Sequence, residues 1–168
     1  TRLPAVPWSW YYAGPLRRLL RGPLGVSLGT RRFVIYRTAD QRLVALDGRC
    51  VHMGADLASG EVEGNCLRCP FHGWAFDPLG KCVDIPAAKK VPEIARVQGY
   101  PTAELGGHVF FFNQPTATFA MPFFDGLEPG DLFSARPFDF EADLPWYLVG
   151  ANGFDGQHFR AAHDRQLI

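Results

Sequence analysis

Two short segments of the sequence combine thiol and imidazole side chains at close spacing. The first is Cys50-x-His52, and the second, after 16 intervening residues, is Cys69-x-x-His72. Each segment puts one sulfur and one ring nitrogen on a tight loop, so two facing loops supply four metal ligands. In a 2Fe-2S cluster with two histidines in place of two cysteines, one iron would take Cys50 and Cys69, and the other would take His52 and His72.

The same four residues could instead hold a structural zinc ion. Cys66 and Cys69 also form a Cys-x-x-Cys pair by themselves. However, Cys-x-His is unusually close spacing for a zinc hook. The loops also contain Gly54, Gly73 and Pro70, and glycine permits the backbone angles and close approach that amide donors to cluster sulfurs require. We therefore predict the cluster, with Cys66 and Cys82 as buried thiols outside it.

A second group of candidate ligands follows the pattern Asn152-x-x-Asp155-x-x-His158-x-x-x-x-His163. In a helix, steps of three residues place the first three members close to one face. Five residues rotate His163 by about 140° from His158, so both face one metal only if the helix ends, bends or widens between them. The helix is expected from about Trp146 onward, and its predicted buried members are Leu148, Ala151, Phe154, Phe159 and Ala162.

Strands must position the first group. From Trp10 to about Asn113, short apolar runs alternate with Gly, Pro and Asp turns, which is typical of an all-β region. Residues 32–37, the polar turn 38–41 and residues 42–46 predict a hairpin, and residues 109–112 predict another strand. These short strands and turns indicate a mainly β fold.

The chain divides into two regions of different composition. Between Asn113 and Pro137 it becomes rich in Pro, Thr, Phe and Gly without a sustained period, which predicts a linker whose phenylalanines pack onto neighbouring surface. We predict one domain at 1–115, a linker at 116–136 and part of a second domain at 137–168.

Bulk composition excludes several classes of protein. With 168 residues, 47% of them apolar and 14% aromatic, the chain can bury a core. Its 17 basic and 17 acidic residues cancel, so no overall field attracts nucleic acid. No apolar run approaches the ~20 residues of a membrane span, and residues 1–20 lack a signal-peptide core. We expect no transmembrane segment and a cytoplasmic protein.

The first motif resembles the Rieske family in the order and spacing of Cys50, His52, Cys69 and His72, and the resemblance extends over about a hundred residues. It implies an antiparallel β domain with an inserted cluster-binding subdomain. Respiratory Rieske proteins carry an extra cysteine in each loop, and these cysteines form a disulfide. Residues without sulfur stand at those positions here, and a tryptophan replaces a hydroxyl residue; the three are Ala55, Phe71 and Trp74. We expect a reduction potential nearer about −150 mV than +300 mV.

The second motif resembles the start of the catalytic domain of Rieske non-heme iron oxygenases, of the aromatic-ring-hydroxylating dioxygenase alpha-subunit type. The resemblance implies that His158 and His163 bind a mononuclear Fe(II), together with a carboxylate that comes later in the family. Asp164 is the only acid after His163, and as its neighbour it points elsewhere. We expect a fragment that holds the first strand and helix of an α+β helix-grip catalytic domain and lacks the third ligand.

The resemblance also implies a function. Electrons from a ferredoxin or a flavin-dependent NAD(P)H reductase would pass through the cluster to the mononuclear iron, where O2 is activated to oxidise an apolar or aromatic substrate. Asp155 would bridge the two centres by accepting a hydrogen bond from a cluster histidine, typically between subunits of a homotrimer. Alternatively, Asp155 only orients His158 or caps local backbone.

Two other functions stay open from the sequence. One is a Rieske ferredoxin, an electron carrier that oxidises no substrate and would need nothing after about Asn113. The other is a zinc-stabilised β module that mediates interactions. The fifth histidine, His108, belongs to neither motif and is predicted to be structural.

Overall fold

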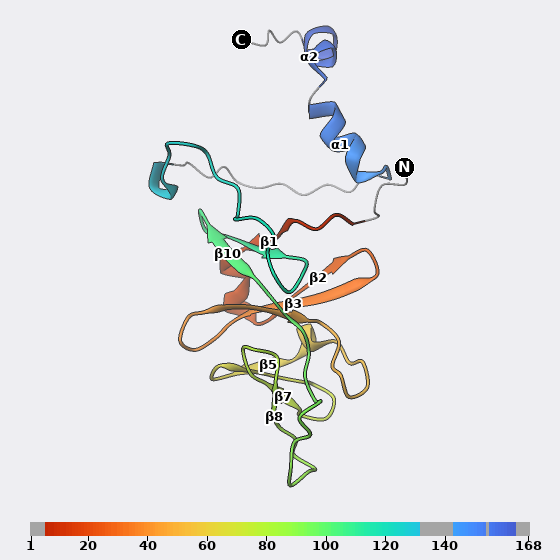
Figure 1. The fold of residues 1–168 in the computed structure, drawn as a ribbon, viewed down its shortest axis with the longest axis vertical. Coiled ribbons are helices and arrows are strands. Elements are labelled where there is room, and N and C mark those ends of the chain that lie inside the picture. Colours follow the sequence, from red (N-terminus) through yellow and green to blue (C-terminus); the bar gives the residue numbers. More distant parts are fainter. Residues whose placement is uncertain (1–5, 132–142, 154, 164–168) are drawn as a thin grey trace. The chain divides into compact units, whose positions relative to one another are not determined.

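The computed structural model describes residues 6–131, 143–153 and 155–163. The chain divides into two compact units, Thr1–Phe133 and Ser134–Ile168. The described part of the first unit forms three antiparallel sheets, and that of the second contains two helices (Figure 1). The predicted mainly β fold is therefore confirmed, while the boundaries at 115 and 136 stay predictions.

The three sheets have the strand orders β1-β11-β10, β2-β3-β4-β9 and β5-β6-β7-β8. The strands are β1 (Trp10–Pro15), β2 (Leu24–Leu28), β3 (Arg31–Arg37), β4 (Leu43–Asp47), β5 (Glu61–Glu63), β6 (Cys66–Arg68), β7 (Ala75–Phe76), β8 (Cys82–Asp84), β9 (Gly99–Tyr100), β10 (Thr102–Leu105) and β11 (His108–Phe112). Short 3-10 turns are η1 (Leu16–Arg21), η2 (Leu57–Ser59) and η3 (Pro129–Asp131).

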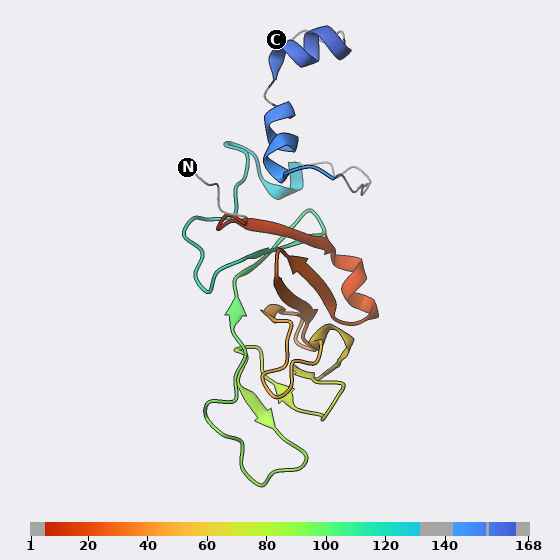
Figure 2. The same cartoon turned by 90° about the vertical axis from the view of Figure 1, so that its right-hand side faces the viewer.

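The third sheet is an insertion into the second. Its four strands occupy the chain between β4 and β9, which are themselves hydrogen-bonded neighbours. The loop that follows β8 projects away from the sheets in both views (Figures 1 and 2). The predicted inserted subdomain is confirmed, and so are the β3–β4 hairpin and the strand β11.

Strand β3 is buried on both faces. Its four central side chains, Phe33, Val34, Ile35 and Tyr36, are fully shielded from solvent. Because successive side chains of a strand point to opposite faces, Phe33 and Ile35 join one core with residues of β11, while Val34 and Tyr36 join another. Burying a side chain of this size is worth about 1.5–3 kcal/mol, so β3 holds both layers together.

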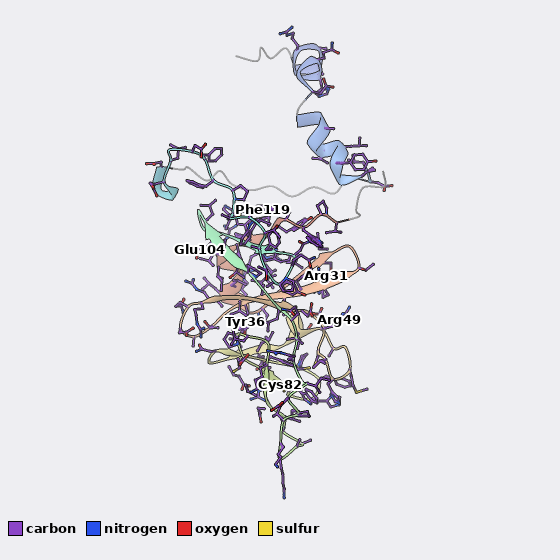
Figure 3. All side chains as sticks on the ribbon, viewed as in Figure 1. Arg31, Tyr36, Arg49, Cys82, Glu104 and Phe119 are labelled. Carbon is purple, nitrogen blue, oxygen red and sulfur yellow. The ribbon has the colours of Figure 1, made fainter. Side chains whose placement is uncertain are left out.

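The second of these cores contains the candidate ligand cysteines. Cys50 and Cys69 pack in one cluster with Tyr36 of β3 and with Phe76 and Cys82 of the inserted sheet. Figure 3 shows Tyr36 above Cys82, where the two layers meet. The core of the domain therefore fixes the places of both thiols.

An ion pair joins β3 to the segment that carries the first motif. The Arg32 guanidinium donates to Asp56 Oδ2 twice, from Nε at 3.2 Å and from Nη2 at 2.9 Å. Asp56 also caps η2 by accepting the Ala58 N–H at 3.1 Å. A Cβ at Gly25 would collide with the guanidinium, so glycine on β2 leaves room for it.

The segment after β11 packs on the first sheet at one phenylalanine. The carbonyl of Phe119 accepts the indole N–H of Trp10 at 3.1 Å, and its ring meets Phe112 edge to face at 5.4 Å between centroids (Figure 3). The predicted packing of linker phenylalanines is confirmed for Phe119. Phe124 is exposed, so the prediction is wrong there.

The second unit contains α1 (Trp146–Gly153) and α2 (Gly156–His163) in place of the single helix predicted from Trp146. The break separates Asn152 from His158, so those residues do not share one helical face as predicted. Gly153 and Gly156 stand on the two sides of the break, and each costs about 1 kcal/mol of helix propensity relative to alanine, which explains why the helix stops there. Neither described helix is long and apolar enough to span a membrane.

The predicted buried face of this helix is wrong where it can be tested. Leu148, Ala151 and Ala162 are exposed rather than buried. Phe154 and the side chain of Phe159 lie outside the described residues, as does most of the segment before Trp146 in which the first catalytic-domain strand was predicted.

Asp56→Ala is expected to lower the free energy of unfolding by about 1–2 kcal/mol at neutral pH, because it removes a cap and a half-buried ion pair. Burial opposes the charged form of Asp56, but the Arg32 guanidinium and the Ala58 amide outweigh it and hold its pKa below the ordinary 3.8. The advantage is therefore present above that value and is lost as the pH falls through the lower folded pKa.

Urea unfolding at several pH values measures this effect. Glu104→Ala on β10 is the matched control, because Glu104 is exposed and makes no ion pair within the described part of the chain. Its expected change is within about 0.5 kcal/mol. Equal losses for the two variants would contradict the role of Asp56.

Candidate functional site

The two predicted ligand segments fold into equivalent loops, the first ligand loop (residues 50–55) and the second ligand loop (residues 69–74). In the first, Cys50 N–H donates to the Ala55 carbonyl at 2.9 Å, and Gly54 N–H donates to the Cys50 carbonyl at 2.8 Å. In the second, Cys69 N–H donates to the Trp74 carbonyl at 2.8 Å. Gly73 N–H then donates to the Cys69 carbonyl at 3.1 Å. Each cysteine thus opens a loop that closes on itself five residues later.

A glycine in left-handed conformation closes each loop. Gly54 has φ +74° and Gly73 has φ +71°, which side chains with a Cβ adopt only at a cost. The surroundings differ, because a Cβ at Gly73 would lie 3.0 Å from Pro86 Cγ, whereas a Cβ at Gly54 would meet open space. The predicted need for glycine beside the ligands is confirmed by these backbone angles.

The loops present their thiols inward and their imidazoles outward. Cys50 and Cys69 are 3% and 4% exposed, whereas His52 and His72 lie at the surface. The two imidazole rings are 4.7 Å apart between centroids. The four predicted residues are therefore brought together in two pairs, one buried and one exposed.

This pairing fits a two-iron cluster better than one zinc ion. Structural zinc needs four donors around a single centre. A 2Fe-2S cluster instead takes two protein ligands at each iron, which is the division into a thiol pair and an imidazole pair.

Burial raises the pKa of the Cys50 thiol to about 11; the backbone amides of His52 and Met53 lower it, and the adjacent Cys69 thiol raises it. Iron favours the thiolate strongly enough to displace the proton from a coordinating thiol. The core that surrounds the sulfurs also limits the access of water to them.

Aromatic rings orient the imidazoles. Trp74, the last residue of the second ligand loop, stacks on His52 of the first at 4.6 Å, with planes 6° apart. Phe71 lies against His72 at 4.0 Å between centroids. The indole therefore couples the two loops, and Phe71 and Met53 leave an exposed apolar rim beside the histidines.

The remaining cysteines and the fifth histidine lie outside the site. All four cysteines are free thiols, so the loops contain no disulfide. Cys82 is buried as predicted and donates to the Asp84 carbonyl, whereas Cys66 is only half-buried. The Nδ1 atom of His108 lies 3.2 Å from the Tyr12 hydroxyl, which agrees with a structural role.

The second motif is only partly assembled. Asp155 caps α2, because its Oδ1 accepts the backbone N–H groups of Gln157 and His158, each at 3.1 Å. Helix α2 is continuous from Gly156 to His163, so the break needed between His158 and His163 is absent and lies before His158 instead. The His158 side chain is half-buried, and that of His163 lies outside the described residues.

Two arginines that the sequence reasoning missed also belong to the ligand loops. The Arg68 guanidinium donates from Nη1 to the Gly73 carbonyl, and Arg49 donates from Nη1 to the Gly54 carbonyl at 3.3 Å. A repeated pattern, Arg-Cys-x-x-x-Gly, marks both loops and could have revealed them.

The family profile described as Rieske [2Fe-2S] domain matches residues 9–101, more than half of the chain. A 3-ketosteroid-9-alpha-monooxygenase, oxygenase component, of Rhodococcus rhodochrous is 38% identical over 108 residues, which cover 64% of this chain and 28% of that protein.

Two further relatives match nearly the whole chain. Aminopyrrolnitrin oxygenase PrnD of Pseudomonas fluorescens is 34% identical over 97% of this chain and 47% of that protein. The solved structure of Pseudomonas putida CBB5 NdmA aligns with a TM-score of 0.78 at 28% identity, over 94% of this chain and 50% of that one. The chain spans about a quarter to a half of the length of the curated relatives named here.

Alanine at Gly73 is expected to disturb the site more than alanine at Gly54. Both substitutions force a Cβ into left-handed backbone, at a cost of about 1–2 kcal/mol. Only at Gly73 must Pro86 also give way. Thermal unfolding and the metal content of the purified variants measure the difference, and an equal or larger loss for Gly54→Ala would refute this account of the packing.

Proposed function

Because the chain belongs to the Rieske [2Fe-2S] domain family, we propose that Cys50 and Cys69 bind one iron of its cluster and that His52 and His72 bind the other. The observation that carries this assignment is the buried thiol pair beneath the exposed imidazole pair, on two loops with the same internal hydrogen bonds. When bound, the cluster accepts and donates one electron at a time.

The protein residues around the cluster have separate tasks. The core around Cys50 and Cys69 keeps water from the sulfurs, and Trp74 holds the plane of the His52 ring. The exposed rings of His52 and His72 face the surface at which a partner can approach. Electron exchange is therefore proposed to occur on the imidazole side.

We propose that the full-length protein is the oxygenase component of a Rieske non-heme iron oxygenase. Relatives with this domain are named as oxygenase components or oxygenases. The chain also continues beyond the matched domain into helices that carry Asp155, His158 and His163, which an electron carrier would not need. The electron-carrier alternative therefore has less support.

His158 and His163 are proposed as two ligands of a mononuclear Fe(II), which would supply O2 activation. Their imidazoles are suitable donors, and the third donor of a facial triad would be a carboxylate from outside this chain. A regular helix separates the two residues by about 140°, so the iron-loaded protein needs α2 to open before His163. His163 is the last residue of α2, where a helix frays most easily.

Asp155 is proposed to have two roles. Both hydrogen bonds to the start of α2 use Oδ1, and Oδ2 accepts no hydrogen bond within the described residues. The second oxygen is thus suited to accept the ring N–H of His52 or His72 from another copy of the chain, as in a homotrimer. The carboxylate would then join helix α2 to a neighbouring cluster.

The electron donor is proposed to be a ferredoxin or a flavin-dependent NAD(P)H reductase, and the substrate an apolar or aromatic small molecule. The relatives support this class, since one is named for a ketosteroid and a structure of NdmA contains caffeine.

The cytoplasm is the proposed compartment, because a donor that draws on NAD(P)H and four unpaired thiols suit a reducing environment.

The purified chain is expected to be coloured, to contain two irons and to show a Rieske-type EPR signal after reduction. Its reduction potential is expected near about −150 mV, since the loops contain no disulfide. Cys69→Ser should abolish the colour, whereas Cys66→Ser, three residues away, should retain it. A colourless chain with one zinc, or loss of colour in both variants, would refute the assignment.

The role of Asp155 is tested in the full-length protein with two variants. Asp155→Asn keeps an oxygen that can cap α2 but removes the charge, whereas Asp155→Ala removes both. If the bridge operates, both variants lose at least about 10-fold in single-turnover oxidation while reductase still reduces the cluster normally. Wild-type turnover by Asp155→Asn, with loss only in Asp155→Ala, would leave capping as the whole role.

A further inference from the structure

Arg68 connects three parts of the cluster-binding subdomain. It is the last residue of β6 and immediately precedes Cys69. Its Nε donates to Glu63 Oε2 at 2.8 Å, and its Nη1 donates to Asp84 Oδ2 at 3.0 Å and to the Gly73 carbonyl at 2.5 Å. The guanidinium therefore ties β5 and β8 to the second ligand loop.

The contact to Gly73 acts on both histidines. Gly73 lies between His72 and Trp74, and its carbonyl belongs to the peptide that leads into Trp74. Fixing that carbonyl fixes the peptide plane, since a peptide unit is rigid. Trp74 in turn stacks on His52, so one hydrogen bond restrains a ligand of each loop.

The first ligand loop has the same contact in a weaker form. Arg49 precedes Cys50 as Arg68 precedes Cys69, and it donates to the carbonyl of Gly54 at 3.3 Å. Arg49 is exposed and makes no ion pair in residues 6–131, whereas Arg68 is held by two carboxylates and its side chain is 30% exposed. The two loops are thus alike in hydrogen bonding and unlike in rigidity.

We propose that Arg68 is a positioning residue of the cluster: anchored by Glu63 and Asp84, it clamps the Gly73 carbonyl and so presents Cys69, His72 and, through Trp74, His52 in the geometry that binds iron. Arg49 makes the weaker equivalent contact in the first ligand loop. This inference rests on the proposed assignment of the four ligands.

The forked shape of the guanidinium is what the position requires. Three acceptors surround Arg68, and the planar fork of arginine can reach them at once, whereas the ammonium of lysine is a single point at the end of a flexible chain. Arg68→Lys therefore keeps the charge but loses the clamp. A role based on charge alone would be restored by lysine.

The test compares cluster-loaded variants of the chain by the rate at which an iron chelator bleaches their visible absorption. Arg68→Gln is expected to lose its cluster at least about 10-fold faster than the parent chain, because residues that orient ligands typically contribute 10–100-fold to metal affinity. Arg68→Lys should remain closer to Arg68→Gln than to the parent. Arg49→Gln should show a smaller increase.

Arg42→Gln is the control for net charge, since Arg42 pairs with the exposed Asp40 in the β3–β4 turn. It should bleach at the parental rate. The EPR spectrum of the reduced cluster supplies a second readout: Arg68→Gln should shift its g values, because the His72 and His52 rings change orientation, and Arg42→Gln should not. Far-UV circular dichroism verifies that each variant is folded.

The double variant Glu63→Gln, Asp84→Asn keeps Arg68 but removes the two carboxylates that hold it. Its bleaching rate is expected to lie between those of the parent chain and Arg68→Gln. If Arg68→Gln does not fold, the double variant tests the clamp in its place. The clamp would be overturned if Arg68→Gln or this double variant bleached at the parental rate with the parental spectrum. It would also be overturned if Arg68→Lys restored both. A parent chain without a Rieske-type spectrum would instead overturn the ligand assignment on which it rests.

Discussion

The double burial of strand β3 is the constraint on which the rest of the structure depends. One face of β3, with Phe33 and Ile35, packs against β11, and the other face packs against the inserted subdomain through Val34 and Tyr36. A polar residue at Val34 would place its polar group in the apolar core between two layers, whereas the Tyr36 hydroxyl donates to the Asn65 carbonyl. The layer that carries the proposed metal ligands is attached to the domain mainly by apolar contact, and the Arg32–Asp56 ion pair adds a polar contact between β3 and that layer.

The site follows from that attachment. Because Cys50 and Cys69 belong to the same core as Tyr36, their positions are set by packing before any metal is considered. The histidines lie outside this core and are oriented by aromatic stacking instead. The proposed cluster would therefore be enclosed on the side of the thiols and accessible on the side of the imidazoles.

The sequence predicted that the two candidate ligand segments come together, because the information for their loops is local. Cys50-x-His52 and Cys69-x-x-His72 lie on short loops whose glycines indicate the backbone conformation. The β3–β4 hairpin is predicted by two apolar runs on either side of a polar turn. It predicted the helical region poorly, because exposure of Leu148 and the break before His158 depend on contacts between distant parts of a chain and on competing glycine costs. The repeated Arg-Cys-x-x-x-Gly pattern marks both arginines, but the ion pairs of Arg68 with Glu63 and Asp84 form only when the strands β5 to β8 assemble into one sheet.

The pairing of β1 with β11 has a consequence for how the domain folds. Trp10 lies opposite Phe112, so this contact closes a loop of about a hundred residues, whereas the segment between Cys50 and Cys69 is only about 20 residues long and contains the β5–β6 hairpin. Loop-closure entropy grows with the logarithm of length, and the difference between these two closures is about 1.5 kcal/mol. The two proposed ligand loops are therefore brought together over a short stretch of chain, whereas the sheet β1-β11-β10 requires the costlier closure.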